Sequence, residues 1–431
     1  MDNKKYANIY IKKRTVPEWL TCYIVMFPLF ISFLVDFINL PSFIKYSADV
    51  VWILMLVIML FLKRNVIFQK KLAPFITYII YFFGMVSITY LFRYQSFAYF
   101  FWGIRNNFRF YVTFLACSMF MDSDDAEDIL KFFDYIFWAN AVISFFQFFV
   151  LGYNQDYLGG VFGVDRGCNA NSLAFFSIVI SKSILSFING KEKAWLCFLK
   201  CGVSLIIAAM AELKFYFIIF IIILVASAMV TRFSARKLIL ILSASFLFML
   251  ASTLMTAVFG EGSSLSLDRI FELITAKSYA TSKDLGRFTA IQTISQGFFN
   301  EINEKLFGFG IGNCDTSTFA VCNSPFYQTY YYLHYTWFSS AFLFLETGYI
   351  GLITFLAFFV LCFFCAKKQL KFDNTNSMYC QISMIISIIC VILTFYNSSL
   401  RMEVSYLIYF ALSLPFLRVS SIDSVQLGGG L

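Results

Sequence analysis

Charged residues are scarce in this chain of 431 residues, where Asp, Glu, Lys and Arg together make up 13%. Soluble proteins carry roughly 25%. Hydrophobic residues account for 60% and aromatic residues for 20%. These proportions exclude a soluble globular enzyme, a disordered chain and a small secreted domain held by disulfides. They are the proportions of a polytopic, all-α integral membrane protein.

Metal-binding residue clusters are also lacking. His334 is the only histidine, and no cysteines or carboxylates gather at the spacing of metal ligands. Protein metal sites are built from such clusters. The sequence therefore argues against a metal site, and it points to no cofactor.

Nearly charge-free runs of about 20 residues, enough to cross a bilayer core of about 30 Å, recur along the chain. They predict about twelve transmembrane helices, nine within 1–258 and three within 344–418, separated by a large loop at 259–343 and followed by a tail at 419–431. The expected spans lie near 19–39, 46–62, 72–92, 106–121, 130–151, 171–189, 196–211, 214–230, 238–258, 344–366, 378–396 and 404–418.

The two halves of the chain do not mirror each other, because the one large loop lies between the ninth and tenth spans. Secondary transporters usually contain repeats with broken helices at matching positions. The absence of a repeat argues against a transporter, and a polysaccharide flippase is the competing class of function.

Most of the 33 Lys and Arg residues fall in the N-terminal segment and in short connections on its side of the expected membrane. Cytoplasmic loops carry such an excess. We therefore expect both termini in the cytoplasm and the loops 152–170 and 259–343 outside. The net charge of +8 is then mainly a topology signal, and we expect no nucleic-acid partner.

Arg287 is a candidate for an anion contact. Within the large loop we expect helices near 268–277 and 285–299, the second capped by Asp284. A helix N-terminus and a guanidinium group both favour phosphate oxygens. Arg287, in the first turn, would therefore hold a phosphate, or else form a surface ion pair with Asp284.

Arg166 lies in the other sizeable outer loop, just before Asn169 and Asn171 at the start of a span. It is a second candidate for a phosphate contact. The alternatives are an ion pair with Asp165 and an anchor at the membrane interface.

Three other cations lie near the outer ends of spans. Lys214 follows Glu212 in a short turn and either pairs with it or supplies another phosphate contact. Arg105 and Arg109 are one helical turn apart. They either extend to the lipid headgroups or line a cavity.

His334 lies beside the large outer loop. A single histidine is often a structural residue, but only histidine has an unperturbed side-chain pKa near neutrality. That property suits a general base acting on a sugar hydroxyl. Glu346 and Asp315 are the next candidates for this role.

Cys314 and Cys322 bracket a short segment of the large loop. Because the outer compartment is expected to be oxidising, we expect them to form a disulfide. The segment 307–313 (FGFGIGN) does not have dinucleotide-fingerprint spacing, and we expect it to form a tight turn on the membrane face.

Several of these pieces, taken together, resemble the O-antigen ligase/polymerase superfamily. The motifs are 165–174 (DRGCNANSLA), 286–288 (GRF) leading to 306–312 (LFGFGIG), and 333–335 (LHY) leading to 346–352 (ETGYIGL). The short turn 211–214 (AELK) also fits. Tyr335 stands where the family usually has Asn.

This resemblance implies a GT-C-like integral membrane glycosyltransferase of the bacterial inner membrane, with its active site facing the periplasm. The implied partners are an oligosaccharide on polyprenyl diphosphate, membrane lipid and a protein that sets chain length. His334, Arg287 and Arg166 would be catalytic, with Lys214 as a further diphosphate ligand and Asn169, Asn171, Arg109 and Glu346 as secondary candidates. The chain most resembles the polymerases, and a ligase acting on the lipid A core is the alternative.

Overall fold

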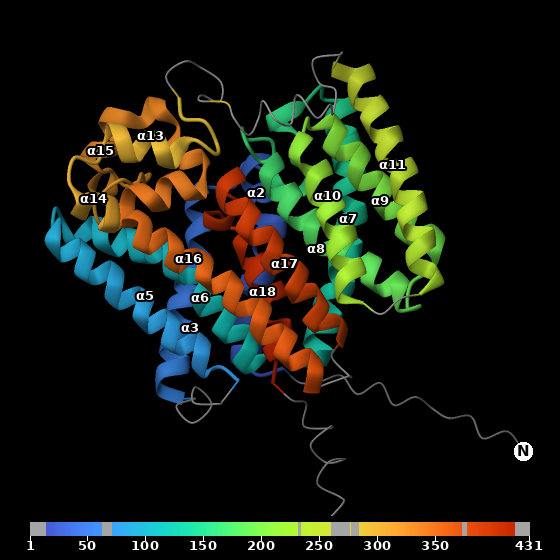
Figure 1. Cartoon of the computed structure of the whole chain (residues 1–431), viewed down its shortest axis with the longest axis horizontal. Coiled ribbons are helices and arrows are strands. Elements are labelled where there is room, and N and C mark those ends of the chain that lie inside the picture. The colour runs from blue at the N-terminus through green and yellow to red at the C-terminus, as the bar shows by residue number, and fades with distance from the viewer. Residues whose placement is uncertain are drawn as a thin grey trace, which may run out of the picture.

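The computed structural model describes residues 14–62, 71–231, 234–259, 276, 284–372 and 377–418. Every regular element in these ranges is a helix (Figure 1). The α-helices are α1 (Val16–Met26), α2 (Pro28–Asp36), α3 (Ser47–Leu62), α5 (Ala73–Phe92), α6 (Phe97–Phe120), α7 (Ser123–Phe149), α8 (Asn169–Ile188), α9 (Ala194–Met210), α10 (Lys214–Val230), α11 (Ala235–Phe259), α13 (Ala290–Gly297), α14 (Ile302–Phe307), α15 (Pro325–Tyr330), α16 (Ser339–Phe372), α17 (Ser377–Tyr396) and α18 (Ser405–Ser413).

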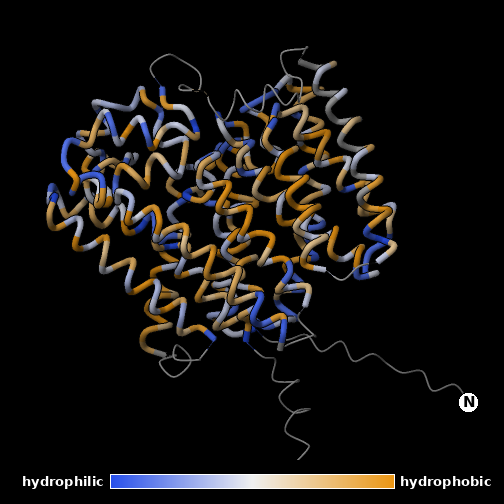
Figure 2. The backbone as a smooth tube through the Cα atoms, viewed as in Figure 1, coloured by the Kyte–Doolittle hydropathy of each residue, from blue (hydrophilic) through white to orange (hydrophobic). Residues whose placement is uncertain are grey.

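Six helices in the described ranges are long and apolar enough to cross a membrane, and the pair α1 and α2 makes a seventh if it counts as one span. This pair bends by 56°, next to Pro28, because proline removes a backbone donor and its ring clashes with the preceding turn. The chain is therefore a helical membrane protein. Figure 2 shows hydrophobic residues along the long helices and many of the hydrophilic ones near their ends.

Each of the twelve expected ranges contains a helix, although several differ in length from the expectation. The helix expected at 106–121 begins earlier, at Phe97, where the Ser96 side chain accepts a hydrogen bond from the Ala98 amide. The helices α9, α10 and α18 are apolar but shorter than 18 residues.

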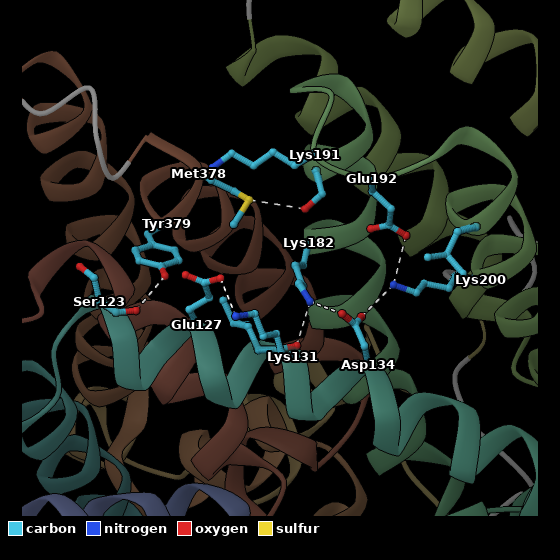
Figure 3. Close-up of a pocket in the computed structure, with 13 residues that line it drawn as sticks. Ser123, Glu127, Lys131, Asp134, Lys182, Lys191, Glu192, Lys200, Met378 and Tyr379 are labelled. Atoms are coloured by element: carbon cyan, nitrogen blue, oxygen red, sulfur yellow. Dashed lines mark hydrogen bonds and ion pairs between the residues drawn. The ribbon is translucent and has the colours of Figure 1, made fainter. Parts of the chain in front are cut away.

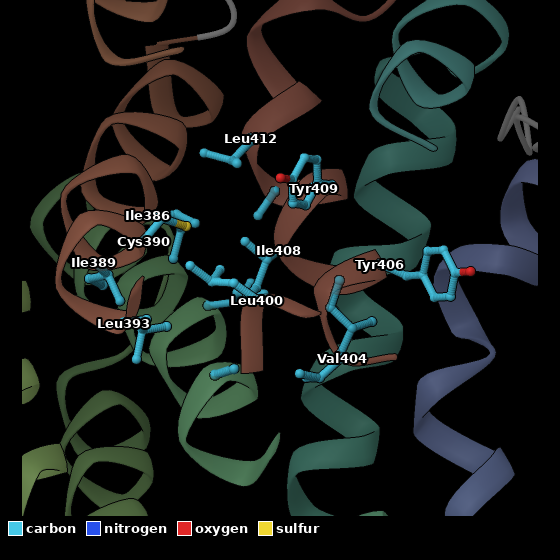
Figure 4. Packing of buried hydrophobic residues seen from close by; sticks show 14 of the residues in the cluster. Ile386, Ile389, Cys390, Leu393, Leu400, Val404, Tyr406, Ile408, Tyr409 and Leu412 are labelled. Carbon is cyan, nitrogen blue, oxygen red and sulfur yellow. The ribbon is translucent and has the colours of Figure 1, made fainter. Parts of the chain in front are cut away.

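Helix α8 lies at the centre of the bundle, and 94% of the residues in its apolar stretch are buried within the protein. It packs against α7, α9, α10, α17 and α18. Figure 4 shows the neighbouring contact, where Ile386 and Leu393 of α17 face Ile408 and Leu412 of α18. Lipid tails are as apolar as these side chains, so close packing, and not escape from water, holds such helices together.

The two ends of the described chain lie together, away from the short helices α13, α14 and α15. Arg14 Nε donates to Asp125 Oδ1 over 3.0 Å, and Arg418 Nη2 donates to Glu18 Oε1 over 2.8 Å. Both ends of the described chain therefore meet near the start of α7. The short helices α13, α14 and α15 gather elsewhere, above the far ends of α5 and α6 (Figure 1).

The expected helix at 285–299 is shorter than predicted, because α13 begins at Ala290. Asp284 is not its cap: it is buried, and the N-cap is Thr289, whose hydroxyl donates to the carbonyl of Ala276. Arg287 therefore lies in the turn just before α13 and not in the first turn of the helix, where it is expected. The helix expected at 268–277, except residue 276, and the tail at 419–431 lie outside the described residues.

The disulfide prediction is wrong, since Cys314 and Cys322 are both free thiols. Cys314 is completely buried, and the Tyr335 hydroxyl donates to its carbonyl over 2.6 Å. Cys322 lies partly exposed in the 3-10 turn η5 (Ala320–Cys322). Their closeness in sequence does not bring them to the same environment.

Candidate functional site: a pocket of cations and aromatic rings

A cavity of about 400 Å³ opens where α8 begins and where α9 and α17 end. Segments far apart in the sequence form its wall, and two of the predicted arginines belong to it. The lining residues are Asp156, Arg166, Gly167, Asn169, Ala170, Glu212, Leu213, Arg287, Trp337, Phe338, Tyr396, Asn397, Ser398 and Met402.

Arg166 is exposed on the wall of this pocket, and its guanidinium carbon lies 5.1 Å from the centre of the Trp337 ring. The amide of Gly167, whose φ is +87°, donates to the Asp156 carbonyl over 2.9 Å and holds the turn. Within the described ranges Arg166 forms no ion pair, so the expected alternative of pairing with Asp165 is not observed. A cation held by an aromatic face and open to solvent can accept an anionic ligand.

Arg287 also lines the pocket, and its guanidinium carbon lies 4.1 Å from the centre of the Tyr396 ring and 5.9 Å from that of Phe338. The Tyr396 ring also stacks on Phe215, with 4.0 Å between centres and 10° between planes. This stacking fixes the tyrosine ring, and the ring in turn positions the guanidinium.

His334 lies beside the pocket and is not part of its wall. Its backbone is left-handed, with φ +53° and ψ +27°, and its ring stacks on Trp337 with 3.9 Å between centres. Nδ1 lies 4.0 Å from Asp284 Oδ2, a carboxylate that is fully buried. The same indole therefore contacts both His334 and Arg166.

Two predicted polar residues near the pocket have structural contacts. Lys214 Nζ forms an ion pair with Glu212 Oε1 at 3.1 Å, the simpler of its two expected arrangements, and only Glu212 lines the pocket. Asn169 Nδ2 donates to the carbonyls of Gln155 and Ala211 and to the Asp156 carboxylate over 3.3–3.4 Å. Asn169 thus joins three segments that form the wall.

Asn171 lines a smaller cavity of about 90 Å³ that shares Arg166 with the main pocket. Asp36, Lys45, Asp165 and Glu403 also face this smaller space. Arg166 consequently stands between the two cavities.

Arg109 lies inside the protein and not at its surface. It is 3% exposed, and its guanidinium donates to Glu403 Oε1 and to the Arg401 carbonyl, each over 3.3 Å. Arg105 likewise pairs with Asp49, at 2.7 Å. Of the two arrangements considered, extension to the lipid headgroups is therefore not what Arg109 does, because it pairs inside the protein with a carboxylate distant in sequence.

Glu346 holds the glycine-rich turn and does not face the pocket. It is fully buried, and its Oε1 accepts hydrogen bonds from the amides of Gly312 (2.9 Å) and Cys314 (3.3 Å). The turn packs where α16 is kinked at Gly348, whose φ is +62°. The kink frees the carbonyls of residues 345 and 346, which accept from the amides of Phe309 and Gly310.

Sequence reasoning missed the aromatic half of the site. Trp337, Phe338 and Tyr396 were not singled out because a chain with 57 phenylalanines offers no pattern that separates a ring facing lipid from one facing a guanidinium. The position of Trp337, three residues after His334, was the one available signal.

No protein-family model matches the chain, and no curated protein matches it in sequence. In the described ranges no group of three or more His, Cys, Asp or Glu side chains could hold a metal ion. The chemistry of the pocket follows from its own residues. It offers two guanidinium groups for a polyanion, aromatic faces for a sugar ring, and an imidazole at its edge for proton transfer.

Proposed function

We propose that the protein is a membrane glycosyltransferase of the O-antigen polymerase type. It would transfer a growing glycan from polyprenyl diphosphate to the non-reducing end of a new lipid-linked repeat unit. The observation that carries this proposal is the meeting of Arg166 and Arg287, 121 positions apart in the printed sequence, on one pocket with Trp337 and Tyr396.

The pocket residues suit the charge changes of such a transfer. The acceptor oxygen attacks the anomeric carbon, its proton passes to the imidazole of His334, and the bond from that carbon to the diphosphate oxygen breaks. The lipid diphosphate leaves with the bonding electrons, and Arg166 and Arg287 stabilise its developing charge. One displacement inverts the anomeric configuration.

The proposed arrangement in the membrane places the pocket and the lysines near the other end of α8 on opposite sides of the bilayer. The twelve predicted spans would cross the bacterial inner membrane in a GT-C-like architecture, with both termini cytoplasmic and the pocket facing the periplasm. Helix α8, which starts beside the pocket, has 20 residues, or about 30 Å at 1.5 Å per residue. This length matches the hydrocarbon core. The other end of α8, where Lys182 and Lys191 lie, would then be on the cytoplasmic side of the membrane.

Deletion of the gene, followed by gel analysis of the lipopolysaccharide, tests the proposal. A lipid A core carrying one repeat unit would support a polymerase, provided that the wild-type gene restores the full ladder. A bare core with polymer still on its lipid carrier would replace the polymerase by a ligase. A bare core with repeat units trapped at the inner leaflet would indicate a flippase.

A further inference from the structure

A second cavity, of about 480 Å³, lies at the other end of α8 and α9, far from the pocket with the two arginines. Figure 3 shows its lining, with residues of α7, the end of α8, the start of α9 and the start of α17 around one space. Four lysines and three carboxylates face it: Lys131, Lys182, Lys191 and Lys200, and Glu127, Asp134 and Glu192. Its formal charge is therefore +1.

The inner wall contains two lysines that share one carboxylate. Lys182 and Lys200 both donate to Asp134, and Lys200 also lies 3.1 Å from Glu192. The Lys200 side chain is 3% exposed and that of Lys182 is 11% exposed. Buried charges are costly unless paired, so this wall is a fixed structure that a ligand would find preformed.

The rim holds the cations that a ligand can recruit. Lys131 pairs with Glu127 one helical turn away, and both side chains are about 60% exposed. Such surface pairs contribute about 0–1 kcal/mol, so the pair can open at little cost. Lys191 is exposed and forms no ion pair in the part of the chain that the structure describes. The guanidinium of Arg236 lies directly against Gly190, the residue before Lys191, although Arg236 does not line the cavity.

We propose that this second cavity binds a phosphate group, as a monoester or diester, between the inner wall and the rim lysines. Ammonium groups bind phosphate as point charges. Basic pockets between membrane helices commonly hold phosphorylated headgroups. Leu130, Leu196 and Met378 supply apolar lining, and Trp195, beside Leu196, is 62% exposed, as is typical of residues at a membrane interface. The inference does not depend on the glycosyltransferase activity.

Native mass spectrometry of the full-length protein in detergent tests this site. The probes are phosphatidylglycerol, diacylglycerol with the same acyl chains, and inorganic phosphate. The variant Lys131→Ala/Lys191→Ala removes two exposed rim cations. Its matched control, Lys367→Ala/Lys368→Ala, removes two exposed lysines near the end of α16, outside the cavity.

We expect the wild type and the control to retain phosphatidylglycerol about tenfold more tightly than the rim variant, and diacylglycerol to be lost from all three. Binding of inorganic phosphate alone, weakened in the rim variant only, would also support the site and would identify a soluble ligand. Equal retention by the two double variants, or retention of diacylglycerol equal to that of the phospholipid, would overturn the proposal.

Discussion

The imidazole of His334 lies nearly parallel to the indole of Trp337, with 20° between the rings and 3.9 Å between their centres. The same indole faces the guanidinium of Arg166 at 5.1 Å. One aromatic side chain therefore sets the relative positions of the proposed base and of one proposed diphosphate ligand. Loss of this ring should affect both groups at once.

Replacement of Trp337 by Ala should abolish the polysaccharide ladder while the protein remains in the membrane, and Trp337→Phe should keep part of it. The matched control is Trp195→Ala, which removes an exposed indole outside the pocket and should leave the ladder unchanged. His334→Ala and Arg166→Ala should each reproduce the Trp337→Ala result. A full ladder from His334→Ala would exclude the histidine as base.

The guanidinium of Arg287 should matter beyond its charge. Arg287→Ala should remove the ladder, and Arg287→Lys should lower the polymerisation rate about ten- to a hundredfold, because it loses bidentate bonding and stacking on Tyr396. This loss corresponds to roughly 1.4–2.8 kcal/mol. Arg93→Lys, the same change at an arginine paired with Glu304 outside the pocket, should keep the wild-type rate in a membrane-based assay. Near-normal activity of Arg287→Lys would mean that charge alone suffices.

The positions of the helices were largely predictable, whereas the partners of the site residues were not. Apolar run length reports bilayer thickness directly, so each expected range contains a helix. The start of α13 was mispredicted, because Asp284 looks like a helix cap in the sequence. In the structure Asp284 is buried beside His334, and the helix begins at Ala290. The pairing of Arg109 with Glu403 joins residues 294 positions apart, and no local pattern encodes such a contact.

Gly308 and Gly348 should each be intolerant of a side chain. Both have φ between +60° and +70°, and an added Cβ would lie 2.5 Å and 2.4 Å, respectively, from backbone atoms of Glu346 and Leu306. Either substitution by Ala should cost at least about 1–3 kcal/mol through backbone strain alone, and thermal unfolding in detergent should show Tm lower by several degrees. Gly84→Ala, at a helical site with nothing within 4 Å, should leave Tm unchanged or slightly raised. An unchanged Tm for Gly308→Ala would contradict the packing described for the turn.

The two thiols of the large loop should differ in reactivity. Burial raises the pKa of both, and that of Cys314 well above the usual range, with Asp315 contributing to each. Because the thiolate is the reactive form, alkylation of Cys322 in the native protein should be slow near pH 7 and accelerate as the pH rises above the ordinary thiol range. Cys314 should react only after unfolding. Mass spectrometry without reductant checks this reactivity. A native protein about 2 Da lighter than the mass with two free thiols, with both cysteines protected from alkylation, would mean that Cys314 and Cys322 form a disulfide after all.

Arg109 should be required for stability and not for substrate contact. It is 3% exposed and pairs with Glu403, whose side chain is 33% exposed. Arg109→Met therefore leaves a half-buried carboxylate without its cation, a loss of about 1–3 kcal/mol, between that of a surface pair and that of a buried pair. The variant should unfold at a markedly lower temperature and accumulate poorly in membranes. Adding Glu403→Gln removes the unpaired charge and should recover part of the lost Tm, since replacing both members of an ion pair costs less than removing one of them. A substrate contact would behave differently: Arg109→Met would keep the wild-type Tm, lose the ladder, and gain nothing from the second substitution.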